Sequence, residues 1–455
     1  NPNNTPGVTS PLASVTPEEI IAYHAGYSDE ERRDFESRIQ SGDAKIIFST
    51  SALESGIDIG QLQVCFLFGT PSESHQIWQR IGRVGRNPKN DSLVVMVNTG
   101  SAVDQYYTAN PEEFLATKDS TLAPVIYPMN PTVRGYHHQA GYFEGIEATD
   151  VDDPEVYKEH VDPAFDKNGA YIRFPLRSPS TIYTLQDETG QTIDQTEYDR
   201  IFRDLYPGAI YRRGHQVYRV GNIDWNNKTI TLRPSTEQNV YTLPMTHVDV
   251  QMQKDTGEYI ALKTPVSPLT VGYGECRVTE YIEGFITKRY NDEYSNKSTY
   301  NQEIRQSLKT TAAYLSISKT HLKEWDSYIP GFRNREAGRI FHGVEHLLRH
   351  SIVSRGYCEN NDVHGYAAHN TEQFGGPACF LYDTTPRGIG IAEQIYTEIT
   401  GLLEHAMHRI KSCPCESGCL ECLLTDGWCD KRNTFLDLDK ELTIEFLKQV
   451  TGFTE

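Results

Sequence analysis

The sequence contains a cluster of cysteines whose spacing suits a metal site. Four thiols fall within ten residues near the C-terminal end, at Cys413, Cys415, Cys419 and Cys422. Four thiolates so close together can complete the tetrahedral coordination of zinc with no open position, so a structural role is favoured over a catalytic one. A redox-active or iron–sulfur cluster is the alternative, and nearby Cys429 could replace Cys413 or Cys415 or remain a free thiol.

A second stretch, residues 79–86 (QRIGRVGR), concentrates positive charge. Within the predicted helix at residues 74–86, Arg83 and Arg86 lie on one helical face, and the small Gly82 and Gly85 let another surface approach closely. Two guanidinium groups presented together suit the spread negative charge of a phosphoryl group during its transfer. Taken alone, however, the stretch is more simply explained by a solvated basic helix face.

Two upstream segments accompany this stretch. Residues 50–59 (TSALESGIDI) directly follow a predicted strand, where the hydroxyls of Thr50 and Ser51 can hold a nucleic-acid phosphate and Asp58 can accept a hydrogen bond from a ribose hydroxyl. Residues 23–26 (YHAG) precede both. In this order and spacing, the three segments resemble motifs of the second RecA-like domain of superfamily 2 helicases.

That resemblance implies roles for individual residues. Arg86 would be the arginine finger, and Arg83 and Gln79 would face the γ-phosphate of ATP, which is bound with Mg²⁺ in such helicases. Gly56 and Asp58 would lie near the nucleotide. Thr50 and Ser51 would contact the nucleic-acid backbone.

The first half of a helicase nucleotide site is missing from the sequence. It contains no G-x-x-x-x-G-K-[ST] loop and no D-E-x-H or D-E-A-D tetrapeptide, which hold the phosphates and magnesium and belong to the first RecA-like domain of the family. The usual opening strand of the second domain is also not visible before Tyr23. We therefore expect the C-terminal part of a helicase, inactive as an ATPase without the missing N-terminal half.

Further motifs specify the family. Residues 380–390 (FLYDTTPRGIG) and Glu393 precede the cysteines, residues 433–436 follow them, and residues 178–180 and 206–211 are also distinctive. Together they resemble the MrfA family of DNA-repair helicases, related to the Hrq helicases, whose C-terminal module is a four-cysteine zinc domain. The usual P-G-G-x-G loop of that family is PRGIG here, so the role of Arg387 is open, although it could contact phosphate.

The elements that must position these residues divide the chain into four parts. Strands predicted at residues 45–50, 63–69 and 92–98 alternate with helices at 28–40 and 74–86, which indicates an α/β domain with a parallel sheet. We assign residues 1–118 to a partial second RecA-like domain, 119–170 to a winged-helix-like segment implied by the resemblance, 171–265 to a β-rich module with a turn at Asn226 and Asn227, and 266–455 to an α+β MrfA-type zinc-binding domain. Residues 303–350 and 391–411 are predicted to be helical.

Three weaker patterns have simpler structural explanations. His342, Glu345 and His346 match the H-x-x-E-H pattern of inverted zinc peptidases, but a packed or capping histidine pair is favoured. Asp383 with Glu393 could bind a nuclease metal, but a structural aspartate at a strand end is favoured. Basic and aromatic residues alternate at residues 211–219, as in single-strand binders and equally in any half-buried sheet.

Composition limits the choice of partner. The 455 residues carry 43 Lys and Arg against 62 Asp and Glu, and this net charge of −19 argues against a protein that coats polyanions but allows a local basic groove. Apolar stretches are too short for a membrane span and no signal segment opens the chain, so we expect a cytoplasmic protein without a membrane partner.

The function implied by the resemblance is ATP-dependent 3′–5′ DNA helicase or translocase activity in DNA repair, on single-stranded or forked DNA. A helicase subunit of a phage-defence system is one alternative. The other is a non-enzymatic, zinc-stabilised DNA-binding or scaffold protein.

Overall fold

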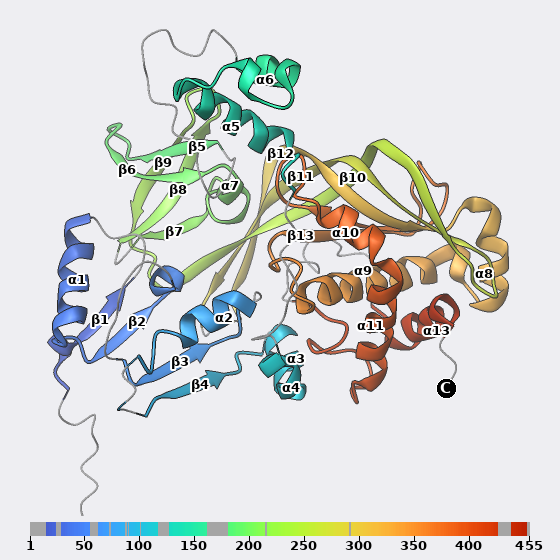
Figure 1. Ribbon diagram of the computed structural model, residues 1–455, viewed down its shortest axis with the longest axis horizontal. Coiled ribbons are helices and arrows are strands. Elements are labelled where there is room, and N and C mark those ends of the chain that lie inside the picture. The colour runs from blue at the N-terminus through green and yellow to red at the C-terminus, as the bar shows by residue number, and fades with distance from the viewer. Residues whose placement is uncertain are drawn as a thin grey trace, which may run out of the picture. The chain divides into compact units, whose positions relative to one another are not determined.

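A computed structural model describes residues 15–23, 29–54, 62–71, 74–86, 89, 91–100, 102–116, 127–161, 181–213, 216–290, 293–425 and 438–452. The chain divides into two compact units, Asn1–Leu122 and Ala123–Glu455. Figure 1 shows the helices and strands of both units.

Parallel strands and helices alternate in the first unit. The 3-10 turn Pro17–Glu19 leads into β1 (Ile20–Tyr23), which pairs in parallel with β2 (Ile46–Ser49) after helix α1 (Asp29–Ser41). Strand β3 (Val64–Phe68) pairs in parallel with β4 (Leu93–Val97) across helix α2 (Ser74–Ile81), and α3 (Ala102–Ala109) and α4 (Pro111–Ala116) follow. This order confirms the predicted α/β class for the first unit.

Helix α2 is shorter than predicted. It ends at Ile81, so the prediction that Arg83 and Arg86 share a helical face is wrong. Two glycines explain the early end: Gly82 has low helix propensity, and Gly85 adopts φ +72°. Between them, Val84 forms a parallel bridge with Leu62, and the Gly85 amide donates to the Leu62 carbonyl.

The second unit begins with short helices and a five-stranded sheet. Helix α5 (Pro131–Phe143), a 3-10 turn (Ala148–Asp150) and α6 (Pro154–His160) precede β5 (Ile182–Gln186), β6 (Thr192–Glu197), α7 (Asp199–Arg203), β7 (Ile210–Arg213), β8 (Gln216–Asp224) and β9 (Thr229–Ser235). The strand order is β6-β5-β9-β8-β7. The Asp224 carboxylate accepts hydrogen bonds from the amides of Asn226 and Asn227, which confirms the predicted β8–β9 turn.

Three long antiparallel strands form most of the next sheet, whose order is β10-β11-β12-β14-β13. They are β10 (Val240–Leu262), β11 (Leu269–Arg289) and β12 (Ser295–Ser316), and we call them the long ribbon. One end packs Ile282 and Ile304 against the core of the β5–β9 sheet, and farther along Val278 and Ala312 belong to a second core with Phe380. Figure 1 shows these strands running from the β5–β9 sheet to the C-terminal helices.

The C-terminal part surrounds the far end of the ribbon with helices. After the 3-10 turn Lys319–His321 come α8 (Leu322–Tyr328), a π-helical turn (Phe332–Glu336), α9 (Ala337–Ser354), β13 (Val363–Ala368), β14 (Ala378–Asp383), α10 (Ile391–Thr397), α11 (Ile399–Ser412) and α13 (Lys440–Thr451). The helix predicted for residues 303–350 is therefore wrong over residues 303–316, which belong to β12. There, pairing with β11 and β14 overrides local propensity. The helices predicted at 391–411 are confirmed.

Arg387 lies in a turn between β14 and α10 with φ +65°, a conformation that favours glycine. We expect Arg387→Gly to raise the free energy of unfolding by about 0.5–1 kcal/mol, because relief of the backbone strain exceeds the added entropy of the unfolded chain. Chemical denaturation would measure it. Arg387→Ala removes the same charge but keeps the strain, so a gain as large in that variant would contradict the backbone explanation.

Candidate metal centre and arginine segment

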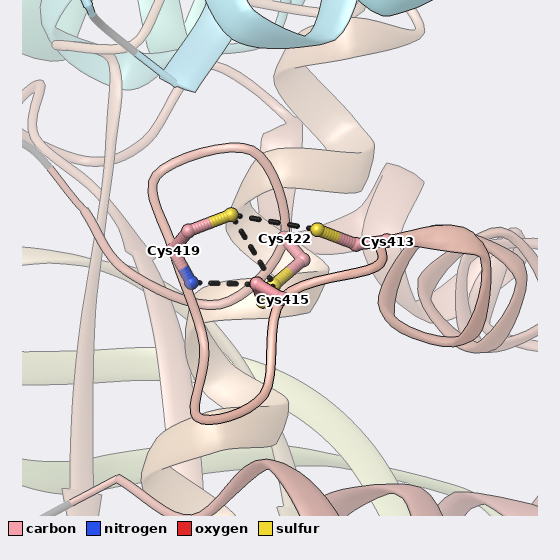
Figure 2. Close-up of side chains that lie close together, drawn as sticks. All are labelled: Cys413, Cys415, Cys419 and Cys422. Atoms are coloured by element: carbon pink, nitrogen blue, oxygen red, sulfur yellow. Dashed lines mark hydrogen bonds between the residues drawn. The ribbon is translucent and has the colours of Figure 1, made fainter.

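The four predicted cysteine ligands lie together in the loop between α11 and Leu424, with their sulfurs directed toward one another (Figure 2). The Sγ atoms are 3.4 Å apart for Cys413 and Cys419, 3.5 Å for Cys415 and Cys422, and 3.9 Å for Cys419 and Cys422. These separations are too long for disulfides. They are close to the sulfur–sulfur edge of about 3.8 Å in a zinc tetrahedron with 2.3 Å bonds.

The loop also supplies the electrostatics that such a site needs. Zinc with four thiolates carries a net charge of −2, which favours a nearby cation. The buried Lys440 ammonium group lies 3.3 Å from the Cys415 Sγ and donates to the carbonyl oxygens of Cys413 and Cys415. Burial by itself raises the pKa of Cys415, but the neighbouring thiols and Lys440 outweigh burial and lower the pKa to about 7. The residues therefore fit a zinc ion held by four thiolates, and Cys429 lies outside the described residues.

Buried side chains hold this loop against the helices. The Arg409 Nε donates to the Glu421 carbonyl, and the ring nitrogens of His346 and His350 on α9 lie 2.8 Å from the carbonyl oxygens of Leu423 and Leu424. Gly418 turns the loop with φ +106°. The sequence predicted the cluster of four cysteines but not these anchors or Lys440, because no spacing pattern connects them to the cysteines.

A buried histidine on α11 should make the zinc module, formed by α9, α11, α13 and the cysteine loop, less stable in acid. The Nδ1 of His405 on α11 lies 3.0 Å from the Ser351 Oγ, and burial with the charges of Arg409 and Arg355 lowers the pKa of His405 to about 4. Because the unfolded chain binds this proton more tightly, His405 should reduce stability as pH falls from about 6.5 to 4, by at most about 1.4 kcal/mol per pH unit.

Denaturation at graded pH tests this expectation. His405→Asn should flatten the slope in that window while the acid sensitivity of the zinc thiolates remains. An unchanged slope in His405→Asn would contradict the assignment.

Burial and hydrogen bonding argue against the peptidase and nuclease interpretations of two weaker sequence patterns. His342, Glu345 and His346 are at most 1% exposed, which leaves no room for a peptide substrate. Asp383 is fully buried and accepts hydrogen bonds from the amides of Ile389 and Ala392, so it has the structural role that the sequence favoured. These contacts position the loop that contains Arg387.

The basic and aromatic residues at 211–219 are used mostly within the fold. Tyr211 and Tyr218 are buried in the β5–β9 core. Arg213 pairs with Asp194, and Arg219 pairs with Glu237. The alternation therefore fits a half-buried sheet, and His215 lies outside the described residues.

The arginine segment, residues 79–86, is held in place by Glu54, which uses both its carboxylate and its backbone carbonyl. The Glu54 Oε2 lies 3.0 Å from both the Nε and the Nη2 of Arg80, and the Arg83 Nη2 donates to the Glu54 carbonyl at 2.5 Å. Glu54 follows the 3-10 turn Ser51–Leu53, whose N-cap is Thr50. The structure thus brings together the two segments that contain Thr50 and Arg83. Sequence reasoning quoted Glu54 within its motif but did not assign it this role.

Several predicted site residues remain accessible around this contact. Arg86 and Gln79 are exposed, Arg83 is half-buried, and Thr50 and Ser51 are exposed at the end of β2. The Arg86 Nε donates to the Gly82 carbonyl over a long distance of 3.4 Å. Gly56 and Asp58 lie outside the described residues, so their assignment stays a prediction.

Two domains of known protein families match this chain. Residues 12–88 match the helicase conserved C-terminal domain, and residues 344–423 match the MrfA Zn-binding domain. The two matches support the C-terminal part of an MrfA-family helicase. The first match covers β1, β2, β3 and the arginine segment, which confirms the RecA-like assignment, and the second covers the four cysteines.

Relatives of this family resemble most of the chain. The ATP-dependent helicase YprA of Bacillus subtilis is 28% identical over 90% of this chain and 55% of its own length, and the ATP-dependent helicase HRQ1 of Saccharomyces cerevisiae is 23% identical over 89% and 40%. A crystal structure of the helicase MrfA bound to DNA is 25% identical with a TM-score of 0.60, over 95% of this chain and 57% of that one. The chain thus spans about half the length of these MrfA-type relatives. In the part that the structure describes, no helix is long and apolar enough to cross a bilayer.

Proposed function

We propose that this chain supplies the second half of the nucleotide site and part of the DNA track of an ATP-dependent DNA helicase. The observation that carries the proposal is the contact of Glu54 with Arg80 and Arg83, which ties the exposed Thr50 and Ser51 to the segment that ends in the exposed Arg86. An arginine held in this way can stabilise the charge of a phosphoryl group in transfer, and the adjacent hydroxyls can bind a nucleic-acid phosphate.

Exposed apolar side chains on β2 and β3 support a partner domain that completes the site. Phe48 is 63% exposed, and Phe66 and Phe68, which point to the same side of β3, are 59% and 70% exposed. Parallel sheets are normally covered on both faces, so this apolar surface favours further polypeptide against it. We propose a first RecA-like domain that holds ATP and Mg²⁺ as part of the same helicase, and without it the chain should not hydrolyse ATP.

The finer features of the proposal follow from the family. We propose 3′–5′ movement on single-stranded or forked DNA, a role in DNA repair, a winged-helix-like arrangement around α5 and α6, and a cytoplasmic location. The zinc module would be a rigid structural part of the surface along which the DNA passes. Its four thiolates leave no coordination position open for catalysis.

Binding at graded salt tests the DNA contact. Fluorescence anisotropy of labelled single-stranded, forked and blunt duplex DNA should show weakening with salt for the chain alone, and the single-stranded or forked probes should bind tightest. Thr50→Ala with Ser51→Ala should weaken binding to all three probes about equally, because phosphate contacts carry no sequence information. Binding that is indifferent to salt, or a double variant with unchanged affinity, would contradict the proposal.

A further inference from the structure

Helix α9 carries a second group of metal-binding side chains, separate from the four cysteines. His342, Glu345 and His346 are spaced i, i+3 and i+4, so they lie on one helical face. All three are buried, and one ligand atom from each lies within 4.8 Å of the others. Glu345 packs against β13, where the Gly365 backbone leaves room for its carboxylate.

The tautomer of His346 is the one that a metal ligand requires. Its Nδ1 lies 2.8 Å from the Leu423 carbonyl oxygen, which can only accept, so Nδ1 carries the proton. Its Nε2 therefore presents a lone pair. Metal-binding histidines characteristically donate their other ring nitrogen to a carbonyl or carboxylate in this way.

That lone pair is buried and has no hydrogen-bond partner in the part of the chain that the structure describes. The Glu345 carboxylate lies beside it, with its Oε2 3.7 Å from the His346 Nε2. A buried nitrogen lone pair without a hydrogen-bond partner thus lies beside a buried carboxylate oxygen, an arrangement that a bound cation would stabilise.

The distance between the His346 Nε2 and the Glu345 Oε2 suits a metal cation bound to both atoms. Bonds of about 2.1 Å from zinc to nitrogen or oxygen place neighbouring tetrahedral ligands about 3.4 Å apart, close to the observed 3.7 Å. The guanidinium group of Arg349, one turn farther along α9, does not fill this place, because its Nε and Nη2 donate to the carbonyl oxygens of Val363 and Asn360. Two imidazoles and one carboxylate are the donors that zinc and similar transition metals prefer.

We propose that His342, Glu345 and His346 form a second metal site that binds a divalent transition metal ion of the zinc class. Because all three ligands come from α9, the ion would stiffen this helix where Glu345 packs against β13 and where His346 contacts the loop of the four cysteines. The cysteine loop and its supporting helix would then each be held by a metal ion.

Metal analysis of the purified full chain tests the site. In buffer without chelators, mass spectrometry should find about two equivalents of zinc per chain, whereas four cysteines alone bind one. His346→Gln and Glu345→Gln should each lower the content by about half. His350→Gln is the matched control: it removes a buried α9 imidazole one turn away that also contacts the cysteine loop, at Leu424, and it should keep both equivalents.

Cobalt substitution separates loss of the site from loss of the fold. Thiolate-to-cobalt charge-transfer absorption reports the four-cysteine site, so it should persist in His346→Gln and Glu345→Gln while the total cobalt falls by half. A wild-type chain with full thiolate absorption and about one equivalent of metal would overturn the proposal, whatever the variants do. Equal metal content in wild type and Glu345→Gln would overturn it as well and leave a shared proton as the explanation.

Discussion

Arg86→Ala should lower ATP turnover by about a thousandfold or more when this chain acts with a first RecA-like domain, the loss typical of an arginine finger. The expectation rests on the exposed Arg86 side chain just beyond Gly85, at the end of a segment that Glu54 holds in place. Nucleotide affinity should change far less than turnover, because the guanidinium group acts mainly on charge that develops during transfer. Steady-state ATPase assays with stimulating single-stranded DNA would measure both quantities.

Two controls sharpen this test. Arg86→Lys keeps the charge but loses the planar fork, so most of the activity should still be lost. Arg33→Ala removes an exposed arginine of the same unit from α1 and should leave turnover unchanged. An Arg86→Ala helicase with near-normal turnover would show that this arginine is not the finger.

Removal of zinc from the four cysteines should unfold the module formed by α9, α11, α13 and their loop. Structural zinc contributes about 10 kcal/mol or more in small zinc domains, which exceeds the stability of most domains. Cys419→Ser should therefore abolish zinc retention and expose the module to proteolysis. Lys440 should increase this destabilisation. Without the metal, its ammonium group stays buried beside cysteines that are no longer all held as thiolates.

Limited proteolysis with mass-spectrometric mapping would locate the loss. Cys276→Ser changes a buried thiol on β11 outside the cluster, and it should keep the zinc and cost only about 1–2 kcal/mol. If Cys419→Ser retained zinc and a protease-resistant C-terminal part, the four-thiolate assignment would be wrong.

The sequence predicted those features that depend on local patterns. Short apolar runs predicted the parallel strands of the first unit, and the spacing of four thiols predicted the cysteine cluster that the structure brings together. Both signals are contained within a few neighbouring residues. The turn at Asn226 and Asn227 was predictable for the same reason.

Features that depend on distant partners could not be predicted in this way. Residues 303–316 are strand because β11 and β14 pair with them, although their polar composition also fits a helix. Arg83 lies beyond the end of α2, where Val84 bridges to Leu62. Lys440 reaches the cysteines from a helix that follows them in the chain, a relation that only the folded structure reveals.

The long ribbon has a mechanical consequence. Each of β11 and β12 contributes residues to two separate hydrophobic cores, so neither core can shift along the ribbon without breaking the register of many antiparallel pairs. A force applied along these strands would load their cross-strand hydrogen bonds together, in shear. The β5–β9 sheet and the C-terminal helices packed on the ribbon should therefore move as one rigid unit when the strands are pulled along their length.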